Sequence, residues 1–215
     1  MPFYDRLIAA TATERAGLQA VPIIRRALAG DVSRDEYLAF LGQAYHHVKH
    51  TVPLLMACGA RLPERLGWLR EAVARYIEEE IGHEEWILDD IAAAGGDPDA
   101  VRQSRPLPAT ELMVAYAYHT IDRGNPAGFF GMVHVLEGTS VALAHQAAGA
   151  IQQRLQLPAD AFRYLTSHGS VDQDHIRFLE DLLNRLDDTE AQAAVTHSAG
   201  MFFGLYGDIF RSINP

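Results

Sequence analysis

The feature that most constrains this fold is the absence of strand-like sequence. No Val-, Ile- or Thr-rich stretch alternates with polar residues between turn signals, so the chain has no evident material for a β-sheet. Short Gly- and Pro-containing breaks, such as Gly95–Pro98 and Gly124–Pro126, separate long segments that can form helices. This pattern predicts an all-α bundle of about seven long helices.

The expected helices can be placed from their start and stop signals. Pro22 should break the first helix, Ser33 should cap the second, and Pro53 should kink the second near its end. The expected ranges are 3–29, 33–59, 63–94, 99–103, 108–122, 127–155, 159–186 and 189–213. With 215 residues, the chain is long enough for one large domain, and we expect a single domain over residues 1–215.

Composition excludes several classes of protein. Eighteen Lys and Arg against 28 Asp and Glu give a net charge of −10, which disfavours nucleic-acid binding. The single cysteine, Cys58, excludes an internal disulfide, a thiolate zinc site and a cysteine-bound iron–sulfur cluster. No apolar run approaches the roughly 20 residues of a membrane span, and no signal peptide is visible. We therefore expect a cytoplasmic protein with no membrane partner.

An acidic run at residues 78–85 contains one histidine, His83. Glu80 and Glu79 lie three and four residues before it, so either can share its helix face. Such a run is also typical of a solvated surface, but nearby apolar residues indicate that part of it faces inward.

Glu137 stands alone among apolar and small residues. A buried carboxylate without a partner or a metal costs several kcal/mol. Its neighbour one turn earlier, His134, offers a simple alternative in which the two side chains hydrogen-bond to each other.

A third set follows the pattern His-x-x-x-Asp-x-x-His. His168, Asp172 and His175 lie at positions i, i+4 and i+7, on one face of a helix that continues with Leu179 and Leu182. The alternative is a set of core residues that satisfy one another. With Glu80, His83 and Glu137, they make six ligands from three helices, enough for two metal ions; oxygen and nitrogen ligands without thiolate favour iron or manganese.

These motifs, in this order, resemble those of the haem-oxygenase-like di-iron oxidases and oxygenases, the superfamily that includes the TenA and PqqC proteins. The resemblance covers nearly the whole chain and implies the haem-oxygenase-like helical fold. It also implies two iron ions per chain, with manganese as an alternative, and O2 as a co-substrate. Carried over by position, the implied ligands are His83, Glu137, His168, Asp172 and His175.

The resemblance leaves the sixth ligand open. UndA-like members carry a glutamate three residues before the first histidine, which matches Glu80, and Glu79 is the second choice. CADD-like members carry it seven residues before, where this chain has Tyr76. A histidine of the second long helix is a further alternative: His47 lies between His46 and His50 on a helix that supplies a ligand in UndA-like members. These histidines could equally form an exposed basic patch.

The resulting hypothesis is a non-haem di-iron oxidase or oxygenase acting on a small substrate that carries an amine or a carboxylate. Its pocket would be lined by Phe129, Phe130, Met132, Tyr118 and Tyr164, with His47, Tyr164 and Tyr76 as candidate catalytic residues. One alternative is a metal-free enzyme related to TenA or PqqC, with Glu137 and His168 as acid and base. Another is a non-catalytic interaction protein that forms a homodimer through residues 201–206.

Overall fold

The computed structural model describes the backbone of residues 1–213 and the side chains of residues 1–166 and 176–213. No β-strand occurs within residues 1–213, so the prediction of an all-α fold is confirmed. The α-helices are α1 (Phe3–Ala10), α2 (Ala12–Gln19), α3 (Pro22–Leu28), α4 (Arg34–Val48), α5 (Thr51–Arg61), α6 (Leu69–Glu80), α7 (His83–Ala93), α8 (Pro98–Gln103), α9 (Pro108–Arg123), α10 (Phe129–Leu155), α11 (Arg163–Arg185) and α12 (Thr189–Ser212). Short 3-10 turns precede α6, α10 and α11, at Glu64–Leu66, Pro126–Gly128 and Ala159–Phe162.

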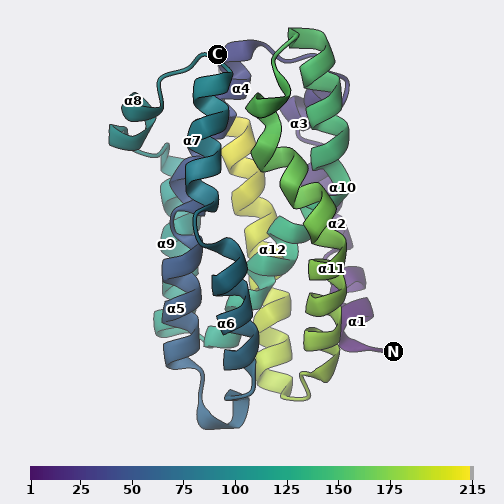
Figure 1. The fold of residues 1–215 in the computed structure, drawn as a ribbon. Helices are drawn as coiled ribbons and strands as arrows, with labels where there is room; N and C mark the ends of the chain where they lie inside the picture. Colours follow the sequence, from purple (N-terminus) through teal and green to yellow (C-terminus); the bar gives the residue numbers. More distant parts are fainter. Residues whose placement is uncertain (214–215) are drawn as a thin grey trace.

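The helices form an elongated bundle around α12, which runs through its middle (Figure 1). Helix α10 packs against both α11 and α12, α5 packs against α6 and α9, and α4 packs against α7. The short α8 projects from one end of the bundle (Figure 1). The candidate ligands from the sequence lie on α6, α7, α10 and α11, and the alternative ligand His47 lies on α4.

Two apolar clusters fill the interior. The larger contains the fully buried rings of Phe130 and Phe202, and the smaller contains Tyr37 and Phe162, whose rings stack at a centroid distance of 5.0 Å. Burying a large apolar side chain contributes about 1.5–3 kcal/mol, so these clusters hold the helices together.

The start of α4 follows the predicted capping pattern. The Ser33 hydroxyl accepts a hydrogen bond from the Glu36 backbone N–H at 3.1 Å, and the Glu36 carboxylate accepts one from the Ser33 N–H at 2.8 Å. This reciprocal pair satisfies two of the N–H groups that a helix start leaves without a partner.

The two prolines act differently from each other. Pro22 is the first residue of α3, which confirms the predicted break near it. Pro53 lies in the first turn of α5, and the break comes earlier than predicted, between Val48 and Thr51. The reason is that Pro53 has no N–H to donate to the carbonyl of Lys49, four residues before it, so the helix cannot continue through that point.

A second prediction, of one helix over residues 63–94, is wrong. Helix α6 ends at Glu80 and α7 begins at His83. Between them, Gly82 adopts a left-handed backbone conformation with φ of 91°, which interrupts the ladder of helical hydrogen bonds. The turn lies between two of the candidate ligands.

The expectation that no apolar run approaches the length of a membrane span does not hold for the segment that contains α10. The segment Pro126–Leu155 is long and apolar enough to span a membrane, by length and composition alone. Half of its most apolar window is buried inside the bundle, and the helix packs against α11 and α12. The same pattern is typical of the central helix of a helical bundle.

Candidate metal centre

A cavity of about 80 Å³ lies where α4, α6 and α10 meet the start of α11. Its polar lining includes two carboxylates and an imidazole from three helices, Glu80, Glu137 and His47. The remaining described residues of the lining are Val48, Thr51, Leu55, Tyr76, Phe129, Met132, Val133, Leu136, Ser140, Tyr164 and Tyr206. Of the residues predicted to line a pocket, Phe129, Met132 and Tyr164 line this cavity.

Two residues predicted to line this pocket lie elsewhere. Phe130 is fully buried in the larger apolar cluster, on another face of α10. Tyr118 contacts His50 instead, with its hydroxyl 3.2 Å from the histidine Nδ1. Adjacent positions on a helix point about 100° apart, which explains why Phe129 and Phe130 have different surroundings.

Glu80 and His83 face each other across the turn between α6 and α7. The Nδ1 atom of His83 lies 3.1 Å from Oε2 of Glu80, and the two side chains are only 11% and 12% exposed. The His83 ring also packs on the indole of Trp86. The turn at Gly82 therefore brings the pair together without a continuous helix, and the solvated-surface alternative is wrong for these two residues.

The neighbouring Glu79 has a different described partner. It forms an ion pair with Arg75 at 2.9 Å, one turn earlier on α6, and its side chain is 29% exposed. Glu79 is not among the described residues that line the cavity, whereas Glu80 is. This geometry favours Glu80 over Glu79 as the ligand from α6.

Glu137 reaches the same cavity from α10, and Tyr76 approaches it from α6. Tyr76 is buried, with 2% of its surface exposed. Burial raises the pKa of the Tyr76 phenol, and the charge of Glu137 and a hydrogen bond to it raise that pKa further. The phenol therefore keeps its proton at neutral pH and is suited to donate it in a hydrogen bond to the Glu137 carboxylate.

His46 and His47, at the end of α4, and His50, just before α5, lie in different environments. His46 and His47 are buried, which contradicts the exposed-patch alternative. His46 contacts the Ser104 hydroxyl through Nε2 at 2.8 Å and the Lys49 amine through Nδ1 at 3.2 Å, while His50 contacts Tyr118. His47 alone of the three lines the cavity, with its ring edge-on to Tyr206.

The alternative that His134 hydrogen-bonds to Glu137 does not hold. Both ring nitrogens of His134 are buried without a hydrogen-bond partner among the described residues, and the ring packs edge-on against Tyr4 and Phe203. Burial, assisted by the charge of Arg15, lowers the pKa of His134 to about 4. The folded protein therefore holds this histidine in its neutral form.

The neutral state of His134 predicts a loss of stability in acid. Below pH 6.5 the unfolded chain takes up a proton that the folded chain excludes, so the free energy of unfolding falls until the pH reaches about 4. Replacing His134 with leucine should remove roughly 2 kcal/mol of the loss between pH 7 and pH 5, because one pKa unit corresponds to about 1.4 kcal/mol. Urea unfolding at the two pH values measures the difference. His145→Leu, at an exposed position on the same helix, is the control, and an equal pH dependence in wild type and His134→Leu would contradict the account.

The last set of predicted ligands, His168, Asp172 and His175, belongs to α11 and lies outside the residues whose side chains are described. The start of the same helix is described. There Tyr164 is buried and lines the cavity.

Asp90 is a residue that the sequence reasoning missed. Its fully buried carboxylate accepts hydrogen bonds from the backbone N–H groups of Arg163 and Tyr164, at 3.0 and 2.9 Å. Burial raises the pKa of Asp90 to about 6, although those two hydrogen bonds oppose the rise. Asp90 therefore fixes the first turn of α11 and with it the position of Tyr164. The one sequence signal for this role is that Asp90 lies on the same helix face as buried apolar residues such as Ile87.

Removal of the Asp90 carboxylate should destabilise the protein. Asp90→Ala leaves two buried N–H groups without an acceptor, and we expect a loss of about 2–3 kcal/mol in the free energy of unfolding. Asp90→Asn keeps one acceptor oxygen and should lose less. Thermal and urea unfolding measure both losses, with the exposed neighbour Asp89 replaced by alanine as a control; equal effects at positions 89 and 90 would refute the capping role.

The donors that line the cavity suit a metal such as iron in chemical type, since carboxylate oxygen and imidazole nitrogen are the ligands of non-haem iron sites. Within residues 1–166 and 176–213, however, no three His, Cys, Asp or Glu side chains gather closely enough to hold a metal ion. Glu80, His83 and Glu137 thus form the described part of the predicted set, and α11 would have to complete it.

Comparison with known proteins links the chain to a family. Residues 38–207 match a protein family described as iron-containing redox enzymes. A search of curated proteins finds no match.

Solved structures show the same fold. A domain of unknown function with a haem oxygenase-like fold from Shewanella denitrificans has 26% identity and a TM-score of 0.87, covering 98% of this chain and 91% of that one. A TenA homologue from Pseudomonas syringae has 12% identity and a TM-score of 0.81, with 99% and 93% covered. Haem oxygenase-1 from Synechocystis, in complex with haem, has 11% identity and a TM-score of 0.80, with 100% and 93% covered. The chain therefore has the haem-oxygenase-like fold that was predicted.

Proposed function

Because this chain belongs to the family of iron-containing redox enzymes, we propose that it is a non-haem oxidase or oxygenase that uses two iron ions and O2. The observation that carries the proposal is the convergence of Glu80, Glu137 and His47, from three helices, on one buried cavity. Carboxylates from facing helices of a bundle are the usual framework of di-iron sites.

Glu80, His83 and Glu137 would hold the metal together with the α11 residues His168, Asp172 and His175. Ferrous iron, when bound, would supply the electrons that reduce O2. The protonated phenol of Tyr76 would orient the Glu137 carboxylate through a hydrogen bond. Apolar residues such as Leu55, Phe129 and Met132 would keep water out of the cavity.

The metal-free alternative remains a distinct hypothesis, because a TenA homologue shares the fold. A cysteine nucleophile finds no support at Cys58. Its thiol is buried on α5, lies 3.3 Å from the Pro126 carbonyl oxygen as a hydrogen-bond donor, and has its pKa raised to about 12 by burial. A metal-free member would have to use acid–base residues instead.

Anaerobic reconstitution tests the proposal directly. Metal-free protein is loaded with Fe(II) under nitrogen, freed of unbound metal and mixed with O2, while O2 uptake and visible absorption are followed. We expect a transient visible band and O2 consumption in proportion to bound iron. Retention of only trace iron, with no band and no O2 uptake, would reject the proposal in favour of the metal-free alternative.

A further inference from the structure

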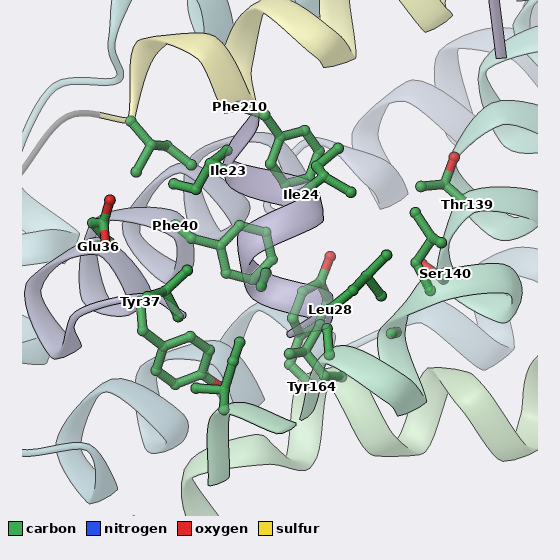
Figure 2. Close-up of a pocket in the computed structure, with 18 of the residues that line it drawn as sticks. Ile23, Ile24, Leu28, Glu36, Tyr37, Phe40, Thr139, Ser140, Tyr164 and Phe210 are labelled. Atoms are coloured by element: carbon green, nitrogen blue, oxygen red, sulfur yellow. The ribbon is translucent and has the colours of Figure 1, made fainter. Parts of the chain in front are cut away.

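A second cavity, of about 100 Å³, lies next to the candidate metal centre between α3, α4, α10, α11 and α12. Apart from Glu36, Thr139 and Ser140, its described lining is aliphatic or aromatic. Figure 2 shows Phe40 and Leu28 near the middle of this lining, with Thr139 and Ser140 on one side and Tyr37 and Glu36 on the other. Such a lining favours an apolar occupant.

Two of the polar groups in this lining, those of Glu36 and Tyr37, are already engaged by the protein. The Glu36 carboxylate forms an ion pair with Arg26 and accepts the Ser33 N–H at 2.8 Å. The Tyr37 hydroxyl donates a hydrogen bond to the Ala161 carbonyl oxygen at 2.6 Å. Since Arg26 already neutralises Glu36, the apolar part of the cavity is the part left to recognise a ligand.

The two cavities share part of their walls. Ser140, Tyr164 and Tyr206 line both of them, and Glu137 lies one helical turn before Ser140 on α10. The two cavities therefore adjoin at these three residues, within one helical turn of Glu137.

We propose that the second cavity binds the apolar tail of the substrate, and that Ser140, Tyr164 and Tyr206 mark the point where the tail ends and the reacting part begins. An apolar cavity of about 150 Å³ holds benzene, so this one suits a tail of about four to six carbons. The role of the tail as part of a substrate rests on the proposed function, whereas its binding does not.

Binding of straight-chain probes to the full-length metal-free protein tests the proposal. Two series, n-alkylamines and n-alkylcarboxylates from propyl to decyl, are titrated by calorimetry. The dissociation constant should fall about fourfold with each added methylene until the cavity is filled, and then level off. The series that binds more tightly identifies the polar group that faces Glu137.

Variants locate the binding. Ala147→Phe on α10 and Ala27→Phe on α3 fill the cavity from two sides and should weaken binding of the octyl probe at least tenfold. The control is Ala142→Phe, at an exposed position on α10 outside the lining. Circular dichroism shows which variants are folded. With two cavity variants, the test still works if one of them does not fold.

Affinity that is independent of chain length, or unchanged in a folded cavity variant, would overturn the proposal. Because no metal is present, failure of this test is distinct from failure to bind iron.

Discussion

Replacing Glu137 with glutamine is expected to abolish stable iron binding. The substitution keeps the size of the side chain but removes the negative charge and one strong oxygen ligand at the cavity wall. Loss of a group that supports a ligand already costs about 10- to 100-fold in metal affinity, so we expect a loss of at least about 100-fold for a direct ligand. Anaerobic equilibrium dialysis against Fe(II), followed by metal analysis, measures the change.

Glu79→Gln is the matched control for this experiment. It makes the same chemical change on α6, at a residue that pairs with Arg75 and is not in the described lining of the cavity. Glu79→Gln should keep the wild-type iron content, and Glu80→Gln should lose at least one of the two ions. Equal iron content in the wild type and Glu137→Gln would remove Glu137 from the metal site.

Replacing Gly131 with alanine is expected to produce the largest loss of stability among single-methyl changes on α10. An added Cβ would overlap the Ser198 hydroxyl oxygen and would lie 2.6 Å from the Val195 carbonyl oxygen and 2.7 Å from the Ala199 nitrogen. Two of these contacts are to the backbone of α12, so the helices would have to move apart. Overpacking of this kind costs about 1–3 kcal/mol, which corresponds to a fall in Tm of roughly 2–12 °C for a chain of this size.

The control on the same helix is Gly149→Ala. No heavy atom lies within 4 Å of an added Cβ at that position. Alanine is the better helix former by about 1 kcal/mol, so this variant should be unchanged or slightly more stable. Differential scanning calorimetry of the two variants distinguishes the cases, and a stable Gly131→Ala protein would show that α10 and α12 do not pack this closely.

Much of the fold was predictable because its signals are local. The Ser33 cap of α4, the start of α3 at Pro22 and the break at Gly95 depend on residues a few positions apart. The missed helix break between α6 and α7 has no such local signal. Gly82 in a helix would cost only about 1 kcal/mol relative to alanine, so sequence alone gives no reason to end the helix there. Tertiary packing sets that turn.

The candidate site also contains some residues that local sequence predicts and others that it does not. The inward positions of Glu80 and Glu137 were predictable, because apolar residues flank the acidic run that contains Glu80 and surround Glu137. The role of Asp90 was not, since its partners Arg163 and Tyr164 lie more than 70 positions away. His46 likewise contacts Ser104, 58 positions along the chain. Contacts of this length depend on how the helices pack, which no local pattern encodes.

The most direct test of the central claim is a crystal structure of the protein loaded anaerobically with Fe(II), with diffraction data collected at the iron absorption edge. We predict two anomalous peaks in the cavity lined by Glu80 and Glu137, with carboxylate oxygens of both residues as ligands and Glu79 still paired with Arg75. A crystal from iron-saturated solution with no peak in this cavity, or with iron bound only elsewhere, would contradict the account.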